Sequence, residues 1–341
     1  MNNDFLLRHA RIVRAVRIAR SFGPILGVLL GVSAWSQAPA DGVPATLVPA
    51  HRVAHAVRAE MSGIAVVGQR LVAVGDHGVV LLSDDAGTAW RQATSVPVDA
   101  RLNATSFVDE RHGWAVGHRG VILHTQDGGD TWILQRSAAQ EDRPLFAVHF
   151  FDASHGVAVG LWSLVLLTDD GGKTWREQTV TPPPGAKKAD LNLLGLFADA
   201  KGRLFAVAEK GMVLVSDDQG HAWRYIETGY QGSFWTGAAT SDGALLVAGL
   251  RGSLYRSVDD GKTWSRIETG GKASITGIAG ADGRVLVVGL DGLVLRSKDN
   301  AASFEPAMRP DRLGLTAAAL LPQGREVLLS RNGPVEFTSG R

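Results

Sequence analysis

The sequence contains no cysteine, and its opposite charges almost cancel. The lack of cysteine excludes disulfide bonds, cysteine-ligated zinc, iron–sulfur clusters and thiol nucleophiles. With 35 Lys and Arg against 34 Asp and Glu, the formal net charge is +1, which does not supply the basic field that nucleic-acid binding uses. Tyrosine is scarce as well, with 3 residues. These shortages disfavour several classes of enzyme and any nucleic-acid partner.

Glycine, in contrast, is abundant, with 41 residues, and it is accompanied by 9 tryptophans. The chain is 45% hydrophobic and 20% charged, a composition that can bury a core and is not typical of disordered proteins. Because glycine adopts backbone conformations that other residues avoid, this excess predicts many tight turns.

Residues 1–40 differ in composition from the rest of the chain. Arginines between residues 8 and 20 precede an apolar run over residues 22–35, which is followed by Ala38-Pro39-Ala40. This order predicts a secretory signal peptide cleaved after Ala40. The alternative is an uncleaved anchor, although the run is shorter than the roughly 18–20 residues that span a bilayer. No later segment is expected to cross a membrane, so residues 41–341 are predicted to reach the periplasm or a lumen-like compartment.

One pattern recurs along the rest of the chain. Each copy has a short apolar segment, Gly-x-x-Gly, a second apolar segment and then Ser/Thr-x-Asp-x-Gly-x-x-Trp. The second glycine or its substitute recurs after roughly 42 residues, at Gly78, Gly120, Ser163, Gly211, Gly252, Gly292 and Gly333. The closing aromatic residue keeps the same register, at Trp90, Trp132, Trp175, Trp223, Trp264 and Phe304. Seven units, of which six have a closing motif, indicate a repeat architecture.

The residues of one unit predict its local structure. The short segments rich in Val, Ile and Leu read as strands, and Gly-x-x-Gly between two of them predicts a tight hairpin. The aspartate of the closing motif is expected to accept hydrogen bonds from backbone N–H groups of its own turn. Each unit thus yields about four strands, and such units must stack to bury both faces. The sequence predicts an all-β, seven-bladed β-propeller of four-stranded antiparallel blades.

The seventh unit ends without a closing motif and therefore lacks a fourth strand of its own. We expect the segment around residues 46–51 to supply that strand, so that an N-terminal strand closes the last blade and protects its edge.

The closing motif is that of the BNR or Asp-box repeat. Together with the Gly-x-x-Gly turn and the preceding Gly113-Trp114-Ala115-Val116-Gly117, it resembles bacterial, exported relatives of the photosystem II stability/assembly factor family. The resemblance covers about residues 46–341. It implies a seven-bladed propeller with an assembly or scaffolding role, since photosynthetic members hold a precursor of a reaction-centre subunit during complex assembly.

The Asp-box aspartates are the most numerous candidates for chemistry, and we interpret them as structural turn caps. They are Asp85, Asp127, Asp170, Asp218, Asp259 and Asp299. Sialidases carry the same boxes but need a tyrosine nucleophile and three arginines, whereas Tyr225 and Tyr255 sit inside repeat strands and no Arg-Ile-Pro motif occurs. Since fold alone does not imply activity, no catalytic residue is assigned. The histidines lack metal-ligand spacing, so neither a metal nor a cofactor is expected.

Two tryptophans break the repeat: Trp162 occupies a Gly-x-x-Gly turn, and Trp235 ends a segment predicted to be a loop between blades. In a four-stranded blade this hairpin opens on the same face as the connection to the next blade. We therefore expect one face with aromatic and basic side chains, as protein-binding surfaces have. The predicted partner-binding residues are His77, His118, Arg119, Trp162, Lys210, Tyr230, Phe234, Trp235, Arg251, Asp291 and Arg331.

These observations predict a non-catalytic, monomeric, exported propeller that acts as an assembly or scaffolding factor. Its expected partner is a protein, either a subunit of a membrane complex or the periplasmic part of a transporter. The alternative is a carbohydrate-binding or glycoside-hydrolysing, sialidase-like propeller, which needs carboxylates and a tyrosine that converge in a central pocket.

Overall fold

A computed structural model describes residues 47–321 and 324–335 of the chain. By their contacts, residues 1–42 and residues 43–341 are separate units, and only the second contains described residues. The predicted signal peptide, residues 1–40, lies outside the described residues. No helix among the described residues is long and apolar enough to span a membrane.

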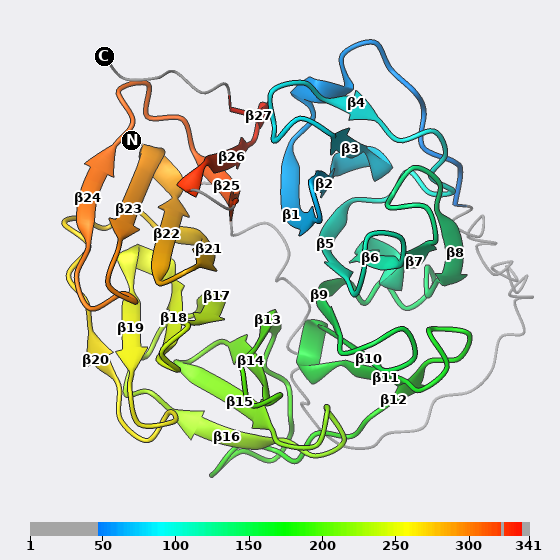
Figure 1. Ribbon diagram of the computed structural model, residues 1–341. Coiled ribbons are helices and arrows are strands. Elements are labelled where there is room, and N and C mark those ends of the chain that lie inside the picture. Colours follow the sequence, from blue (N-terminus) through cyan, green and yellow to red (C-terminus); the bar gives the residue numbers. More distant parts are fainter. Residues whose placement is uncertain (1–46, 322–323, 336–341) are drawn as a thin grey trace, which may run out of the picture. The chain divides into compact units, whose positions relative to one another are not determined.

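The described residues form seven antiparallel sheets, each built from strands that are consecutive in the chain, and the sheets follow one another around a ring (Figure 1). The predicted seven-bladed β-propeller is therefore confirmed. Six sheets contain four strands, and the seventh contains three strands within the described part of the chain.

The strands occupy equivalent positions in every blade. The innermost strands are β1 (Met61–Val67), β5 (Leu102–Phe107), β9 (Leu145–Phe150), β13 (Leu193–Ala198), β17 (Phe234–Ala239), β21 (Ile275–Ala281) and β25 (Leu315–Leu320). The second strands are β2 (Arg70–Gly75), β6 (Gly113–Gly117), β10 (Gly156–Gly160), β14 (Leu204–Ala208), β18 (Leu245–Gly249), β22 (Arg284–Gly289) and β26 (Glu326–Ser330). The third strands are β3 (Val80–Ser83), β7 (Ile122–Thr125), β11 (Val165–Thr168), β15 (Met212–Ser216), β19 (Leu254–Ser257), β23 (Leu293–Ser297) and β27 (Gly333–Pro334). The outer strands are β4 (Arg91–Gln92), β8 (Ile133–Arg136), β12 (Arg176–Glu177), β16 (Arg224–Glu227), β20 (Ser265–Arg266) and β24 (Glu305–Met308).

Short 3-10 turns complete the architecture. One precedes the first strand, η1 (Ala56–Arg58). The others join the second strand of a blade to the third: η2 (Asp76–Gly78), η3 (His118–Gly120), η4 (Leu161–Ser163), η5 (Leu250–Gly252) and η6 (Leu290–Gly292).

The ring closes because each inner strand contacts the inner strands of both neighbouring blades, including β1 against β25. Small residues make this approach possible: a Cβ atom on Gly63 would lie 3.0 Å from the carbonyl oxygen of Asn103 in the next blade. The core lies between adjacent sheets rather than in one centre. Val72 and Leu82 of the first blade, for example, pack in one buried cluster with Leu123 of the second. Burial between sheets explains why single repeats cannot fold alone.

The predicted closure of the seventh blade by an N-terminal strand is wrong for the described part of residues 46–51. Ala50 donates a backbone hydrogen bond to Val96, and the carbonyl of His51 accepts one from the Gln92 side chain. These contacts hold the segment against the first blade. The chain then forms η1, which contacts β27. Pro334 has no N–H to offer a further strand, so proline and η1 protect the edge of the seventh blade.

The two glycines of Gly-x-x-Gly serve different purposes. Gly75 has an extended backbone with φ −164°, and a Cβ atom there would clash with the carbonyl of Glu60. Gly78 instead has φ +67°. The second glycine thus supplies the left-handed backbone of the turn, whereas the first permits close approach to the segment that enters the inner strand.

Candidate functional site

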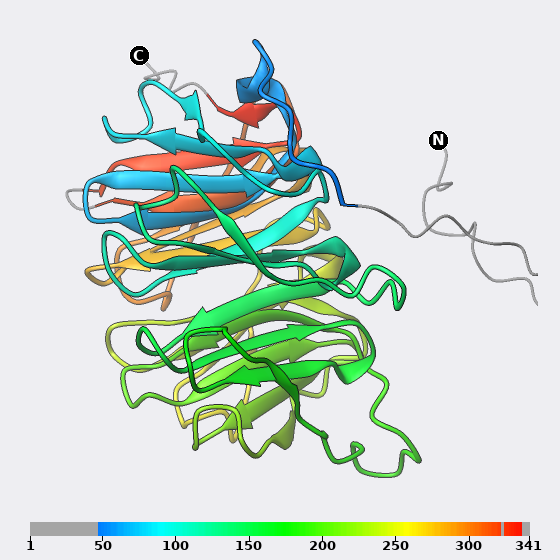
Figure 2. The ribbon, with the colours of Figure 1, turned by 90° about the vertical axis from the view of Figure 1, so that its right-hand side faces the viewer.

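The propeller has two chemically different faces, which Figure 2 shows from the side. On one face the hairpins between second and third strands contact the segments that enter the inner strands; Asp76 N–H, for example, donates to the carbonyl of Glu60. We call this the hairpin face. On the other, the Asp-box turns contact the loops between first and second strands, as Gly171 N–H does with Ser154. We call this the Asp-box face.

The six Asp-box aspartates all lie in turns between the third strand and the outer segment of a blade, on the Asp-box face. Asp170 accepts hydrogen bonds from the N–H and hydroxyl of Thr174 at 2.9 and 2.7 Å and from the hydroxyl of Thr168 at 2.9 Å. The Thr168 oxygen in turn accepts the N–H of Gly172 at 2.8 Å. Equivalent bonds occur in the other boxes. The carboxylates are thus engaged in holding their own turns.

These hydrogen bonds also determine the charge of the boxes. The N–H of Thr174 is the largest cause that lowers the pKa of Asp170 to about 2. The hydroxyl of Thr263 has the same effect on the pKa of Asp259, which is about 2. A general acid needs a raised pKa, so these groups are suited to capping rather than to acid catalysis.

The degenerate sixth box keeps this turn without its glycine and tryptophan. Asp299 still accepts the N–H of Ser303 at 3.0 Å, and Asn300 and Ala301 take φ values of +54° and +63°. Ala301 is fully buried. The hydrogen bonds of the aspartate are therefore sufficient to hold a strained backbone in this turn.

The hairpin face presents six turns with two successive residues at positive φ. In η2, His77 and Gly78 have φ +53° and +67°, and Val79 N–H donates to the carbonyl of Asp76. This is a type I′ turn, whose first central position favours asparagine, aspartate or glycine. The residues at that position are His77, Arg119, Trp162, Lys210, Arg251 and Asp291, with φ between +53° and +58°.

Four of these six residues are poorly suited to a left-handed backbone: Arg119, Trp162, Lys210 and Arg251. A non-glycine residue in that conformation costs on the order of 1–2 kcal/mol. The second position, in contrast, cannot vary freely; a Cβ atom on Gly252 would lie 2.7 Å from the carbonyl oxygen of Gly271. Apart from Ser163, which has φ +55° at the second position, the strained side chains therefore occur at the position whose identity the fold leaves free.

Trp162 is the most prominent of them, because 59% of its surface is exposed. Its backbone N–H donates to Oδ1 of Asn192 at 3.1 Å, and Asn192 donates through Nδ2 to Glu209 Oε1 at 3.1 Å. Asn192 lies in the connection to the fourth blade, and Glu209 lies in its hairpin. Ser274 lies at the same repeat position as Asn192, directly before an inner strand, and its hydroxyl likewise accepts the backbone N–H of the hairpin residue Arg251 at 3.1 Å. Sequence reasoning missed these residues, because their role depends on a contact with the hairpin of the preceding blade.

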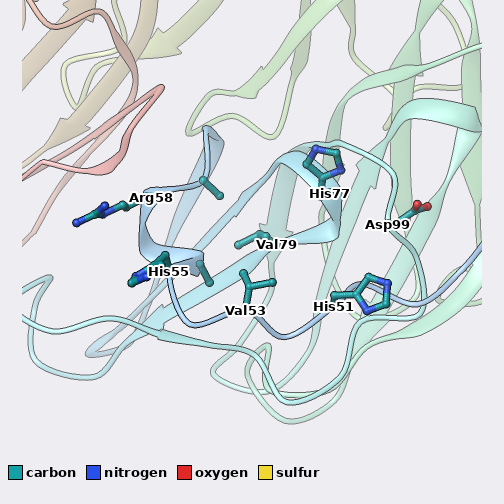
Figure 3. Close-up of a pocket in the computed structure, with 9 residues that line it drawn as sticks. His51, Val53, His55, Arg58, His77, Val79 and Asp99 are labelled. Atoms are coloured by element: carbon teal, nitrogen blue, oxygen red, sulfur yellow. The ribbon is translucent and has the colours of Figure 1, made fainter.

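A pocket of about 440 Å³ adjoins the first hairpin. In Figure 3, His77 and Asp99 lie on one side of it and His55 and Arg58 on the other, with Val53 and Val79 between them. The N-terminal segment supplies His51, Val53 and His55. No group of three or more His, Cys, Asp or Glu side chains in the described part of the chain is placed to hold a metal ion.

Two related pockets adjoin hairpins of later blades. One of about 490 Å³ is lined by Asp291 and Arg312 among others. Another of about 660 Å³ is lined by Arg251 and Tyr230 among others. Arg251 and Asp291, which the sequence analysis predicted as partner-binding residues, thus border pockets on the hairpin face.

The structure brings most of the predicted partner-binding residues to the hairpin face but corrects two of them. Phe234 is fully buried, as the first residue of β17, and packs against Tyr255. Trp235 lies in the strand rather than in a loop, at an irregularity of the β17–β18 pairing, and is half-buried. The exposed members are His77, His118, Trp162, Lys210, Arg251, Asp291 and Arg331, and the half-buried ones are Arg119 and Tyr230.

Fold and turns together define a seven-bladed Asp-box propeller. The family described as "Photosynthesis system II assembly factor YCF48" matches residues 84–177 and 139–264, which together make up more than half of the chain. The chain belongs to this family.

Curated relatives match over short stretches. The chain is 46% identical over 48 residues to the chloroplastic photosystem II stability/assembly factor HCF136 of Cyanidioschyzon merolae, which is 14% of this chain and 11% of that protein. It is 42% identical over 41 residues to the photosystem II assembly protein Ycf48 of Thermosynechococcus vestitus, 12% of each chain. The matched stretches thus span about a tenth of the curated relatives.

Solved structures share the fold. "YCF48 bound to D1 peptide" superposes with a TM-score of 0.67 at 19% identity, over 82% of this chain and 92% of that one. Virginiamycin B lyase from Staphylococcus aureus gives a TM-score of 0.69 at 11% identity, over 85% and 97% of the two chains. Since propellers of different activity fit equally well, these likenesses bear on the fold alone.

Proposed function

We propose that the protein is a non-catalytic assembly or scaffolding factor that binds a protein partner through its hairpin face. The observation that carries this proposal is the set of strained side chains at Arg119, Trp162, Lys210 and Arg251. Strain of this kind is typically kept where it serves binding or catalysis. Aromatic and arginine side chains are also those that dominate the energetics of protein interfaces.

The family supports the same role, because its members are named as assembly factors and one solved relative is described as bound to the D1 peptide. We infer that the partner of this chain is a subunit of a membrane complex or the periplasmic part of a transporter, met after export.

Catalysis is not part of the proposal, because two of the three tyrosines are poorly placed to act as nucleophiles. The hydroxyl of Tyr230 donates to the carbonyl of Leu250 at 2.9 Å, and that of Tyr225 is buried. The Asp-box carboxylates lie on the opposite face from the pockets of His77, Arg251 and Asp291. Turnover of a glycoside by the purified protein would contradict this part of the proposal.

Site-specific photo-crosslinking in the native host tests the proposed surface. A photo-reactive amino acid at position 162 is expected to give a discrete crosslink to a membrane-associated protein. Position 133 is the matched control: Ile133 is 57% exposed, similar to Trp162, but belongs to the outer strand β8. Equal products from both positions, or none from position 162, would remove the hairpin face as the binding surface.

A further inference from the structure

The groove beside the hairpin of the fifth blade departs from its counterparts in chemistry. It has a volume of about 660 Å³ and is lined by Tyr230, Arg251, Ser253, Tyr255, Arg266 and Lys272, among others. It therefore combines three cations, two tyrosines and a serine, and its size is typical of a small-molecule site.

Comparison of the repeats shows that part of this lining is specific to the fifth blade. Ser253 follows the second glycine of the hairpin, a position that is apolar in the other six units: Val79, Val121, Leu164, Met212, Leu293 and Pro334. Tyr255 lies two residues later, at a position that is leucine in five of the other six units: Leu81, Leu123, Leu166, Leu214 and Leu295. Two departures from the repeat thus converge on one groove and give it a chemistry that the other blades lack.

The hydroxyl of Ser253 is both buried and unpaired within the described part of the chain. The residue is 3% exposed, and its hydroxyl has no hydrogen-bond partner among the described residues. Leaving a buried hydroxyl unpaired is unfavourable, and natural proteins do so rarely. A ligand that supplies an acceptor would remove this deficit.

Two of the three cations of the groove are without an acidic partner among the described residues. Within the described part of the chain, neither Arg251 nor Lys272 has a carboxylate within 4.0 Å. Arg266 has only the exposed Glu268, with 3.8 Å between Nε and Oε1. Three cations and a hydroxyl donor around one recess match an anion with several acceptor oxygens and about two negative charges. Phosphate monoesters have these properties, whereas a single carboxylate carries one charge.

Two tyrosine rings give the groove an apolar wall beside its charged side chains. The rings of Tyr230 and Tyr255 lie 5.6 Å apart, and both contact Phe234 in the core. Since the Tyr230 hydroxyl already donates to the carbonyl of Leu250, the ring is held in place and offers an apolar surface beside the cations.

We propose that this groove of the fifth blade binds a phosphate monoester, with Arg251, Arg266 and Lys272 as the charged contacts and Ser253 as a hydrogen-bond donor. The phosphate belongs either to a small soluble phosphoester or to the headgroup of a lipid such as phosphatidic acid. The site does not require the protein partner proposed above, and it stands if crosslinking from position 162 fails.

Thermal unfolding of the mature protein in increasing inorganic phosphate, at constant ionic strength set with chloride, tests the site. The unfolding midpoint is expected to rise saturably with phosphate. In the double variant Arg251→Gln/Lys272→Gln the apparent Kd should increase at least about tenfold, as expected for the loss of charge-assisted hydrogen bonds. The matched control Lys187→Gln/Lys188→Gln removes the same charge from an exposed loop and should retain the wild-type response.

Ser253→Val tests the hydroxyl separately, because valine occupies this position in the first two blades and is compatible with the fold. Its apparent Kd for phosphate should rise by about three- to tenfold.

Sedimentation with phosphatidic acid vesicles, compared with phosphatidylcholine vesicles, then identifies the source of the phosphate group. Binding lost in the Arg251→Gln/Lys272→Gln variant assigns the lipid headgroup, and phosphate binding without vesicle binding assigns a soluble phosphoester. Equal responses of wild type and double variant in both assays would overturn the proposal.

Discussion

The two faces of the propeller both carry a repeated turn, yet the two kinds of turn are stabilised in opposite ways. On the Asp-box face, a carboxylate and a hydroxyl satisfy the backbone of each turn, and even the degenerate turn of Asn300 and Ala301 is held by Asp299. On the hairpin face, the residues at the left-handed position contribute no such bonds to their own turns. Four of them, Arg119, Trp162, Lys210 and Arg251, are residues that the conformation disfavours.

The difference shows which face is determined by folding and which is free to serve another purpose. A repeat that keeps aspartate, serine or threonine at one turn preserves stability there. A repeat that places arginine, lysine and tryptophan where asparagine or glycine would fit better gives up stability, on the order of 1 kcal/mol for each position. Proteins tolerate such losses mainly at functional sites.

Among the predicted effects, the loss of stability in acid should distinguish the two faces most strongly, because it depends on the Asp boxes. Hydrogen bonds lower the pKa of Asp170, Asp259 and Asp299 to about 2, from an ordinary value of 3.8. The folded state therefore binds fewer protons than the unfolded state, and the stabilisation is complete above about pH 4 and is lost as the pH falls towards 2. Unfolding midpoints measured from pH 5 to pH 2 should fall steeply below pH 4.

His77→Asn is the control for this titration, because it changes a hairpin of the other face. It should leave the shape of the profile between pH 4 and pH 2 unchanged. A flat profile in the wild type would show that the boxes do not hold the fold.

Thr168→Val should have the next largest effect. The substitution keeps the shape of a side chain that is 3% exposed but removes the acceptor for Gly172 N–H and a donor to Asp170. A buried N–H without a partner costs roughly 1–3 kcal/mol, so the free energy of unfolding should decrease by about 2 kcal/mol in urea titrations. Ser253→Val is the matched control on the hairpin face, where the hydroxyl has no partner; it should not destabilise. Equal losses in both variants would contradict the comparison.

The sequence was sufficient for the fold because its repeat fixes the register of every blade. Trp90, Trp132, Trp175, Trp223 and Trp264 recur at intervals of 42, 43, 48 and 41 residues, which stacked four-stranded units satisfy. The aspartates were also predictable, since the residues that they bond lie within four positions of them in the chain.

The parts that were not predictable depend on contacts between blades. Phe234 was expected at the surface, yet it occupies the position of Leu102, Leu145 and Leu193, the buried first residue of an inner strand. A stricter alignment of the repeats at that position would have revealed this. The course of residues 47–53 along the first blade, in contrast, depends on Val96 and Gln92, which no local pattern connects to them.

The central claim is that side chains at the left-handed hairpin positions are retained for binding at the expense of stability. Lys210→Asn tests it most directly, because the lysine is exposed and asparagine suits its φ of +57°. The free energy of unfolding should rise by about 1 kcal/mol, whereas Asp291→Asn, already favourable, should change it little. In the same Lys210→Asn protein, the crosslink from position 162 should weaken. A variant that is no more stable than wild type and that crosslinks equally well would contradict the account.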